Sequence, residues 1–284
     1  MAETITTKML QELRDRTGVG MSKCKDALVR AGSNIDLAIE ILRKEGMASA
    51  VKKEGRETRE GFIGVKEKKE WIALVEVNAE TDFVAKNESF VAFVDDLSEQ
   101  LASLGRSIDL EGFLGLKFSA DESVTVEQFR NLLVQKFGEN IKIKRIELIR
   151  KEKHHSYGIY SHMGGKIVTV AALSGAEDES DLAKAVAMHV AAEAPDYLKP
   201  EDVPAEVVAK EEEIAKSQVK GKPENVIGKI VLGKVNAFYD QVCLSRQKYI
   251  KDTNSTVENF VKSAGDKNGK SLALAGFRYW KVGC

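Results

Sequence analysis

Apolar residues in the first 47 positions recur at intervals of three and four, which places them on one face of a helix. Ser33 with Asp36 would form a capping box at the start of the third such stretch, and Gly46 would end it. The pattern predicts a bundle of three short helices, a form more typical of docking than of catalysis. The repeating positions are Met9, Leu10 and Leu13; Cys24, Ala27, Leu28 and Ala31; and Ile35, Ala38, Ile39 and Leu42.

The pattern changes after Met47. Residues 47–61 are rich in charge and lack apolar periodicity, which indicates a linker and a domain boundary. Two runs typical of β-strands, 61–66 and 71–78, are joined across the charged residues 67–70 and predict a β-hairpin. An amphipathic helix follows, and the residues on its apolar face are Phe90, Phe93, Val94, Leu97 and Leu101.

A further helix over 126–137 would begin at a capping box formed by Thr125 and Gln128 and would end at Gly138. A strand over 140–150 comes next. Its alternation shifts partway along, which suggests a β-bulge. The shift lies between Ile143 and Ile146.

The order hairpin, helix, helix, strand then recurs. Residues 157–161 and 167–173 predict a second hairpin, helices are expected over 180–192 and 256–264, and a strand over 272–282. We therefore predict an α+β fold with a duplicated core of antiparallel sheets backed by helices. The predicted domains are 1–55 (three helices and linker), 56–153 and 154–284.

The second half carries an insertion that contains all 4 prolines of the chain. Helices over about 204–218 and 223–239, separated at Gly221-Lys222-Pro223, would form an antiparallel helical hairpin, a coiled-coil arm. The residues expected to line it are Val207, Val208 and Ile214 on one helix and Ile227, Ile230, Val231 and Phe238 on the other.

Composition narrows the class of protein. The chain has 284 residues, of which 43% are hydrophobic and 31% charged, the balance of a globular protein. Lys and Arg total 43 against 44 for Asp and Glu, so no basic excess points to nucleic acid. The basic stretch 142–153 alternates with isoleucines, which favours a strand with one wet face over an RNA site.

The N-terminus predicts no signal peptide, and no apolar run is long enough to span a membrane. The three cysteines, Cys24, Cys243 and Cys284, lack metal or disulfide spacing, so we predict a reduced, cytoplasmic protein.

Motifs for catalysis are missing from the sequence. It contains no phosphate-binding GxxxxGK[ST] loop, no GxSxG nucleophile turn and no HExxH metal pair. His154 and His155 are adjacent and would point in opposite directions from a strand. His189 lies in a predicted helix, where a core-edge role is favoured over a partner contact. We predict no enzyme activity, no metal and no cofactor.

The segment Thr81-Asp82-Phe83-Val84-Ala85-Lys86-Asn87 is unusual because an aromatic ring stands beside a carboxylate where a polar connection is expected. Phe83 could staple the loop onto the core while Asp82 caps an amide. Phe83 could instead be an exposed anchor for another protein. From the residues alone the two interpretations stand equal.

Several separate motifs resemble the bacterial elongation factor Ts family, and they occur in the family's order over nearly the whole chain. They imply a ubiquitin-associated-like three-helix domain, a two-part core and a coiled-coil arm. The motifs are Leu13-Arg14, Arg16-Thr17-Gly18, Gly20-Met21, Cys24-Lys25, Ala27-Leu28, Glu76-Val77-Asn78, Thr81-Asp82-Phe83-Val84-Ala85, Gly138-Glu139-Asn140-Ile141 and Met188-His189-Val190-Ala191-Ala192.

The resemblance also implies a function: exchange of guanine nucleotide on the GTPase elongation factor Tu during translation elongation. Thr81, Asp82, Phe83 and Val84 would intrude beside the nucleotide of the GTPase and dislodge its Mg²⁺. We expect no direct nucleotide binding by the chain itself, and a homodimer of heterodimers through the arm is left open. The implied partner contacts are Leu13, Arg14, Met21, Lys25, Phe137, Gly138, Glu139, Asn140, Met188 and His189.

The sequence leaves two other functions open. One is an interaction module that does not stimulate exchange, such as a ribosome- or RNA-associated adaptor. The other is an enzyme that uses Asp82, which would lack a second acid, base or metal set. The sequence ends at Cys284, just after the last predicted strand, whereas some members of the family continue into a helical extension.

Overall fold

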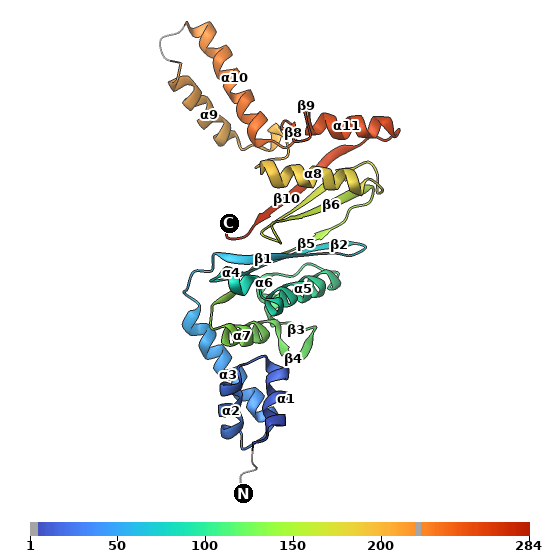
Figure 1. Cartoon of the computed structure of the whole chain (residues 1–284). Helices are drawn as coiled ribbons and strands as arrows, with labels where there is room; N and C mark the ends of the chain where they lie inside the picture. The colour runs from blue at the N-terminus through green and yellow to red at the C-terminus, as the bar shows by residue number, and fades with distance from the viewer. Residues whose placement is uncertain (1–4, 220–222) are drawn as a thin grey trace. The chain divides into compact units, whose positions relative to one another are not determined.

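The computed structural model describes residues 5–219 and 223–284. The chain divides into two compact units: unit 1 comprises Met1–Arg150, Gly164–Lys166 and Lys281–Cys284, and unit 2 comprises Lys151–Met163 and Ile167–Trp280. Both units combine helices with antiparallel sheet (Figure 1), so the predicted α+β class is confirmed. The division into three domains at 55 and 153 stays a prediction.

Unit 1 begins with three helices and continues into a sheet covered by further helices. Its elements are α1 (Thr7–Thr17), α2 (Met21–Arg30), α3 (Ile35–Lys53), β1 (Glu60–Glu67), β2 (Trp71–Ala79), α4 (Asp82–Ala85), α5 (Glu88–Ser103), α6 (Leu110–Gly115), β3 (Lys117–Phe118), β4 (Asp121–Thr125), α7 (Val126–Phe137) and β5 (Ile141–Arg150).

The first three helices pack their apolar faces together as predicted, with Leu13, Cys24 and Leu42 fully buried. The predicted end of the third helix at Gly46 is wrong, because α3 runs on to Lys53. A Cβ atom at Gly46 would lie 3.1 Å from a backbone oxygen of α7, so this glycine allows the two helices to approach closely. The first part of the predicted linker is therefore helical.

The start of α3 also differs from the prediction by one position. Asn34, rather than Ser33, is the N-cap, and its side chain accepts a hydrogen bond of 3.0 Å from the N–H of Leu37. Ser33 has a φ of +67° and belongs to the turn before the helix. Asparagine is at least as good an N-cap as serine. The sequence therefore did contain a capping residue at this helix start, but the prediction placed it one position too early.

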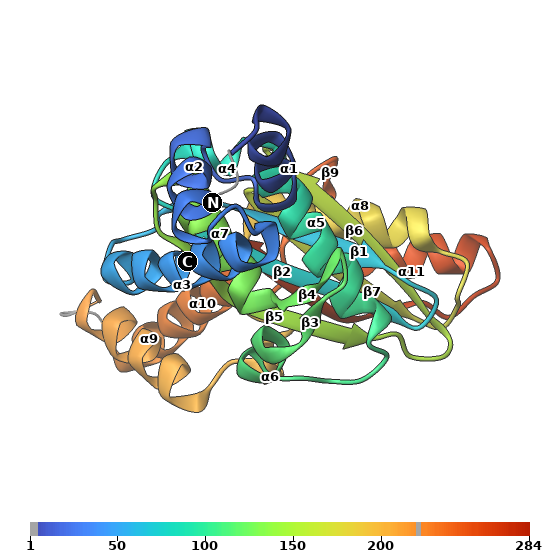
Figure 2. The ribbon, with the colours of Figure 1, turned by 90° about the horizontal axis from the view of Figure 1, so that it is seen from below.

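The sheet of unit 1 is antiparallel in the order β1-β2-β5, and α5 lies across β1 and β2 (Figure 2). All five predicted apolar residues of α5 are buried. The predicted bulge is confirmed: Ile143 pairs with Val77 and Arg145 with Glu76, so Lys144 is the extra residue. The bulge lets residues on both sides of it turn their apolar side chains toward the same helices.

Unit 2 repeats this plan. Its elements are β6 (His155–His162), β7 (Ile167–Ser174), α8 (Ser180–Glu193), the short 3₁₀ helix η1 (Pro200–Asp202), α9 (Ala205–Ser217), α10 (Glu224–Val242), β8 (Lys248–Tyr249), β9 (Asp252–Thr256), α11 (Val257–Lys267) and β10 (Ala273–Lys281). The sheet order is β10-β7-β6. As in unit 1, where β5 pairs with β2, a strand from later in the chain, β10, pairs with the second strand of the hairpin, β7.

A repeated segment supports the duplication. Residues 117–129 (KFSADESVTVEQF) and 248–260 (KYIKDTNSTVENF) each form a two-stranded ribbon that leads into a helix. The registers correspond, with Lys117 opposite Thr125 and Lys248 opposite Thr256. Each threonine is also the N-cap of the following helix, and the predicted capping box at Thr125 is confirmed.

In the insertion, α9 and α10 lie side by side in opposite directions (Figure 1). Their buried seam is formed by Ala215, Val219, Val231 and Val235. The prediction that Ile214 lines this seam is wrong, since it is 41% exposed and its neighbour Ala215 faces α10 instead. The predicted break at Gly221 and Lys222 lies outside the described residues.

Candidate functional site

The segment after β2 presents an exposed aromatic side chain. The chain leaves the sheet at Ala79 and forms the single helical turn α4, which begins after Thr81. Val84 and Ala85 point into the core and are buried, whereas Phe83 is 85% exposed. Among the large apolar side chains of the described residues, none has a higher exposed fraction. The alternative in which Phe83 staples the loop onto its own core is therefore wrong.

The polar residues of this turn have distinct roles. Thr81 is the N-cap and accepts a hydrogen bond of 3.4 Å from the N–H of Val84. Asp82 forms an ion pair with Lys86, with 2.7 Å between Oδ2 and Nζ. The hydrogen bond from Lys86 lowers the pKa of Asp82, and the same contact raises the pKa of Lys86. The capping role that the staple alternative gave to Asp82 is thus filled by Thr81.

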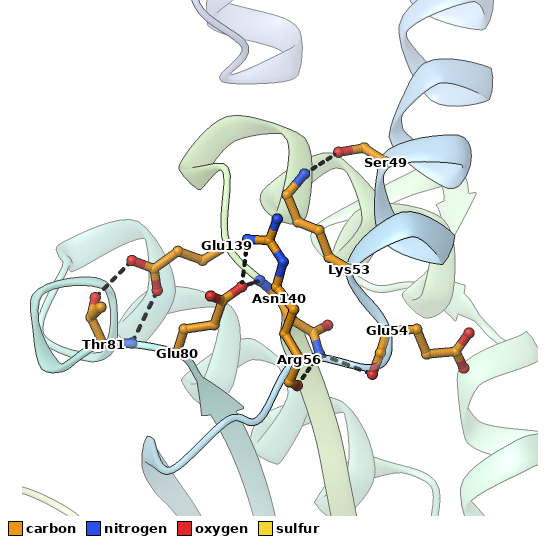
Figure 3. Close-up of polar contacts among 8 residues, drawn as sticks. All are labelled: Ser49, Lys53, Glu54, Arg56, Glu80, Thr81, Glu139 and Asn140. Atoms are coloured by element: carbon orange, nitrogen blue, oxygen red, sulfur yellow. Dashed lines mark hydrogen bonds and ion pairs between the residues drawn. The ribbon is translucent and has the colours of Figure 1, made fainter.

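A second segment, the turn after α7, lies against the first (Figure 3). The Glu139 carboxylate accepts hydrogen bonds from the backbone N–H of Thr81 at 3.0 Å and from its hydroxyl at 2.8 Å. The Glu80 carboxylate accepts one from the backbone N–H of Asn140 at 2.6 Å. Residues 58 and 60 positions apart in the chain are thereby joined. The structure brings the predicted site residues Thr81, Glu139 and Asn140 together, and it adds Glu80, which the sequence analysis did not single out.

The remaining residues of that turn are arranged around Gly138, which has a φ of +76° and is exposed. Asn140 is 3% exposed, so its side chain belongs to the interior rather than to the surface. Phe137 is half-buried, and the Lys136 ammonium lies 5.4 Å from the centre of its ring. Burial, followed by the nearby Arg14, lowers the pKa of Lys136.

In the N-terminal helices the predicted contacts divide into two groups. Arg14 and Lys25 are exposed and Met21 is 39% exposed, so all three reach the surface. Leu13 is completely buried between the helices, so in the free chain it is a core residue, and its direct contact with a partner stays a prediction. Its regular apolar spacing was the signal for a core position.

Sequence reasoning missed Val29, which is 60% exposed. It follows Met21 and Lys25 at intervals of four along α2, so the three share one face of that helix. An apolar residue out of phase with the buried positions 24, 27 and 28 was the signal that could have revealed it.

In unit 2, His189 is an interior residue of α8 with no exposed surface. Its Nδ1 accepts a hydrogen bond from the N–H of Ile250 at 3.3 Å, and Nε2 lies 3.0 Å from the Gln247 side-chain oxygen. Burial lowers the pKa of His189, so the neutral ring is favoured. The contact of His189 with a partner stays a prediction, and the adjacent Met188 is half-buried.

The described residues contain no group of three or more His, Cys, Asp or Glu side chains arranged to hold a metal ion. In the same part of the chain, no helix combines the length and the apolar character needed to cross a lipid bilayer. A cavity of about 680 Å³ is formed by residues of α11, the start of β10 and the segment before η1, and it includes none of the predicted site residues.

Comparison with known proteins agrees with the resemblance. The model of the family described as elongation factor TS matches residues 80–284. Elongation factor Ts of Protochlamydia amoebophila (strain UWE25) is 53% identical over 279 residues, which cover 98% of this chain and 99% of that protein. Elongation factor Ts of Chlamydia felis is 44% identical over 274 residues, which cover 96% of this chain and 97% of that protein.

The family match and these relatives, aligned over 96% and 98% of the chain, define a translation elongation factor, which acts in protein biosynthesis. Within that class, the chain belongs to the elongation factor Ts family.

Proposed function

We propose that this protein is a guanine-nucleotide exchange factor for the GTPase elongation factor Tu. In this mechanism Thr81, Asp82, Phe83 and Val84 enter the GTPase beside its bound GDP and displace the Mg²⁺, so that GDP leaves and GTP can bind. The observation that carries the proposal is the 85% exposure of Phe83 on a turn whose other apolar residues are buried. An aromatic side chain presented in this way is an efficient interface anchor.

The physical basis lies in how GTPases hold GDP. The phosphates are bound together by Mg²⁺, a lysine and backbone N–H groups, so a small shift of that cradle weakens all the contacts at once. Binding of the factor and binding of the nucleotide then oppose each other by the same free energy. The factor speeds release without forming a covalent bond, and it needs neither a cofactor nor a nucleotide site of its own.

Other surfaces would fix the position of the turn on the GTPase. We assign this role to Arg14, Met21 and Lys25 on the N-terminal helices and to Phe137 and Gly138 next to the turn. All of them are exposed or half-buried. Met188 in unit 2 is a further contact under the same proposal. Leu13 and His189 contribute by supporting these surfaces from inside.

The finer architecture belongs to the same proposal. The three N-terminal helices would form a ubiquitin-associated-like domain, and α9 with α10 a coiled-coil arm through which two factor–GTPase complexes could associate. The three predicted domains would then correspond to a docking domain and two core subdomains. The protein would work in the cytoplasm, where translation takes place.

The test uses elongation factor Tu loaded with a fluorescent GDP analogue. Adding the chain should accelerate loss of the analogue when Mg²⁺ is saturating. Chelating the Mg²⁺ should accelerate release without the factor and should shrink the further acceleration that the factor gives, because both act on the same ion. Binding without acceleration at any Mg²⁺ concentration would instead favour the adaptor function and refute exchange.

A further inference from the structure

The one-turn helix α4 cannot hold its own shape. Starting a helix fixes several residues for a single hydrogen bond, so an isolated turn of four residues is unstable in water. The buried side chains of Val84 and Ala85 anchor the turn from below. Its N-terminal end, where the chain leaves the sheet, is held by polar contacts. The direction in which Phe83 points therefore depends on those contacts.

The contacts form a reciprocal pair, which we call the carboxylate latch: Glu80, Thr81, Glu139 and Asn140 (Figure 3). The Glu139 carboxylate accepts a hydrogen bond from the N–H of Thr81, and the Glu80 carboxylate accepts one from the N–H of Asn140. Each segment thus supplies a carboxylate to the backbone of the other. Hydrogen bonds to an ionised acceptor are shorter and stronger than neutral ones, so the latch is well suited to fixing a loop.

A third segment ties the latch to the end of α3 (Figure 3). The buried Asn140 side chain donates hydrogen bonds to the backbone oxygens of Glu54 at 3.3 Å and Arg56 at 3.0 Å. The Arg56 guanidinium lies 3.4 Å from the Glu80 carboxylate. The turn that carries Phe83 is therefore connected through side chains to the segment that follows the N-terminal helices.

Building on the proposed function, we infer that Glu80 and Glu139 are positioning residues for exchange. They hold the Phe83 turn in a fixed direction and do not themselves contact the GTPase. Both oxygens of Glu139 are already engaged by Thr81, which leaves the carboxylate committed to its own molecule. The Glu80 side chain is 23% exposed and is shared between Asn140 and Arg56.

The experiment compares Glu139→Ala with Glu139→Gln in the full chain. Alanine removes both acceptors. Glutamine keeps one oxygen for the N–H of Thr81, and its amide can donate to the threonine hydroxyl, so it preserves the latch without the charge. Glu122→Gln, an exposed carboxylate on β4, is the matched control.

Two readouts separate positioning from binding. Amide hydrogen exchange on the free chain should show faster exchange at Thr81, whose N–H loses its acceptor, in Glu139→Ala and near-parent protection in Glu139→Gln. In the GDP-release assay, Glu139→Ala should lower the saturating rate by at least roughly tenfold, because it removes two hydrogen bonds to a carboxylate and the loss of one such bond corresponds to about that factor. The concentration of factor that gives half of the maximal rate should change little, because the docking residues are intact. Glu139→Gln should keep most of the parent rate.

The outcomes are distinct. If Glu139→Ala loses amide protection yet releases GDP as fast as the parent, the positioning role is refuted. If Glu139→Gln keeps the amide protection of Thr81 yet is as slow as Glu139→Ala, the carboxylate acts through its charge on the partner, and the inference fails. If the parent chain itself gives no acceleration, the proposed function fails, and this result is recognisable before any variant is tested.

Discussion

Replacing Phe83 with alanine should abolish most of the exchange activity while leaving the fold intact. The side chain is 85% exposed in the free protein, so removing it costs the chain little packing. Surface substitutions of this kind change the free energy of unfolding by about 0.5 kcal/mol or less. The whole effect should therefore appear in the complex with the GTPase.

The size of that effect follows from the exposed surface. An aromatic side chain carries about 200 Å² of surface, of which 85% is about 170 Å². Burying this area against a partner stabilises the contact by about 4 kcal/mol at 25 cal/mol per Å². Anchors at measured interfaces contribute about 2 to 4 kcal/mol, which corresponds to a roughly 30- to 1000-fold loss in release rate.

The assay measures fluorescent GDP release from elongation factor Tu together with unfolding of the free factor in urea. Phe90→Ala is the matched control, because it removes the same side chain from a position on α5 with no exposed surface. That variant should lose about 3 to 5 kcal/mol of unfolding free energy. Met163→Ala, which removes a side chain 65% exposed in unit 2, should change neither measurement.

Two results would refute the reasoning. Loss of stability in Phe83→Ala comparable to that of Phe90→Ala would mean that the ring packs inside its own molecule. A stable Phe83→Ala variant that releases GDP within threefold of the parent rate would mean that the turn is not what drives release.

Three further predictions concern stability. Because burial lowers the pKa of His189, this residue takes up a proton in the unfolded chain before it does so in the folded chain as the pH falls. In urea unfolding, the free energy of unfolding should therefore be retained above about pH 6.5 and should decrease below it. His189→Gln should remove this pH dependence, whereas His154→Asn should keep it. Gly158→Ala would place a Cβ atom 2.0 Å from the backbone of α8, so we expect a loss of about 3 kcal/mol in urea unfolding, and a loss below 1 kcal/mol would contradict the close packing. Glu76 is fully buried against Arg145 at 2.7 Å, and Glu76→Gln should cost about 3 kcal/mol in the same measurement, whereas an unchanged midpoint would show that the pair adds nothing.

The local signals in the sequence were the most reliable. The capping box at Thr125 and the helix end at Gly138, whose backbone is in the left-handed conformation, depend only on neighbouring residues, and both are confirmed. Gly46 illustrates the limit of that approach. Glycine is common at helix ends, but here it allows α3 to pack closely against α7. The residues in contact are about 85 positions apart in the chain, so no local pattern reveals the contact.

The same limit applies to the candidate site. Sequence reasoning could single out Phe83, because an aromatic residue in a polar connection is unusual, but it could not decide whether the ring faces inward or outward. It also placed the motif residues Leu13 and His189 at the partner surface, although the structure buries both. The pairing of Glu139 with Thr81 joins two distant turns and became visible only in the folded chain.

The composition of unit 1 has a practical consequence. It takes in Gly164–Lys166 and Lys281–Cys284 as well as the first 150 residues. The Gly165 carbonyl accepts a hydrogen bond of 2.9 Å from the N–H of Ile63, and the Glu76 carboxylate accepts one of 3.0 Å from the N–H of Gly283. A protease that nicks the chain once between 151 and 163 would therefore leave fragments that still elute together from a sizing column. The two fragments would part only in denaturant.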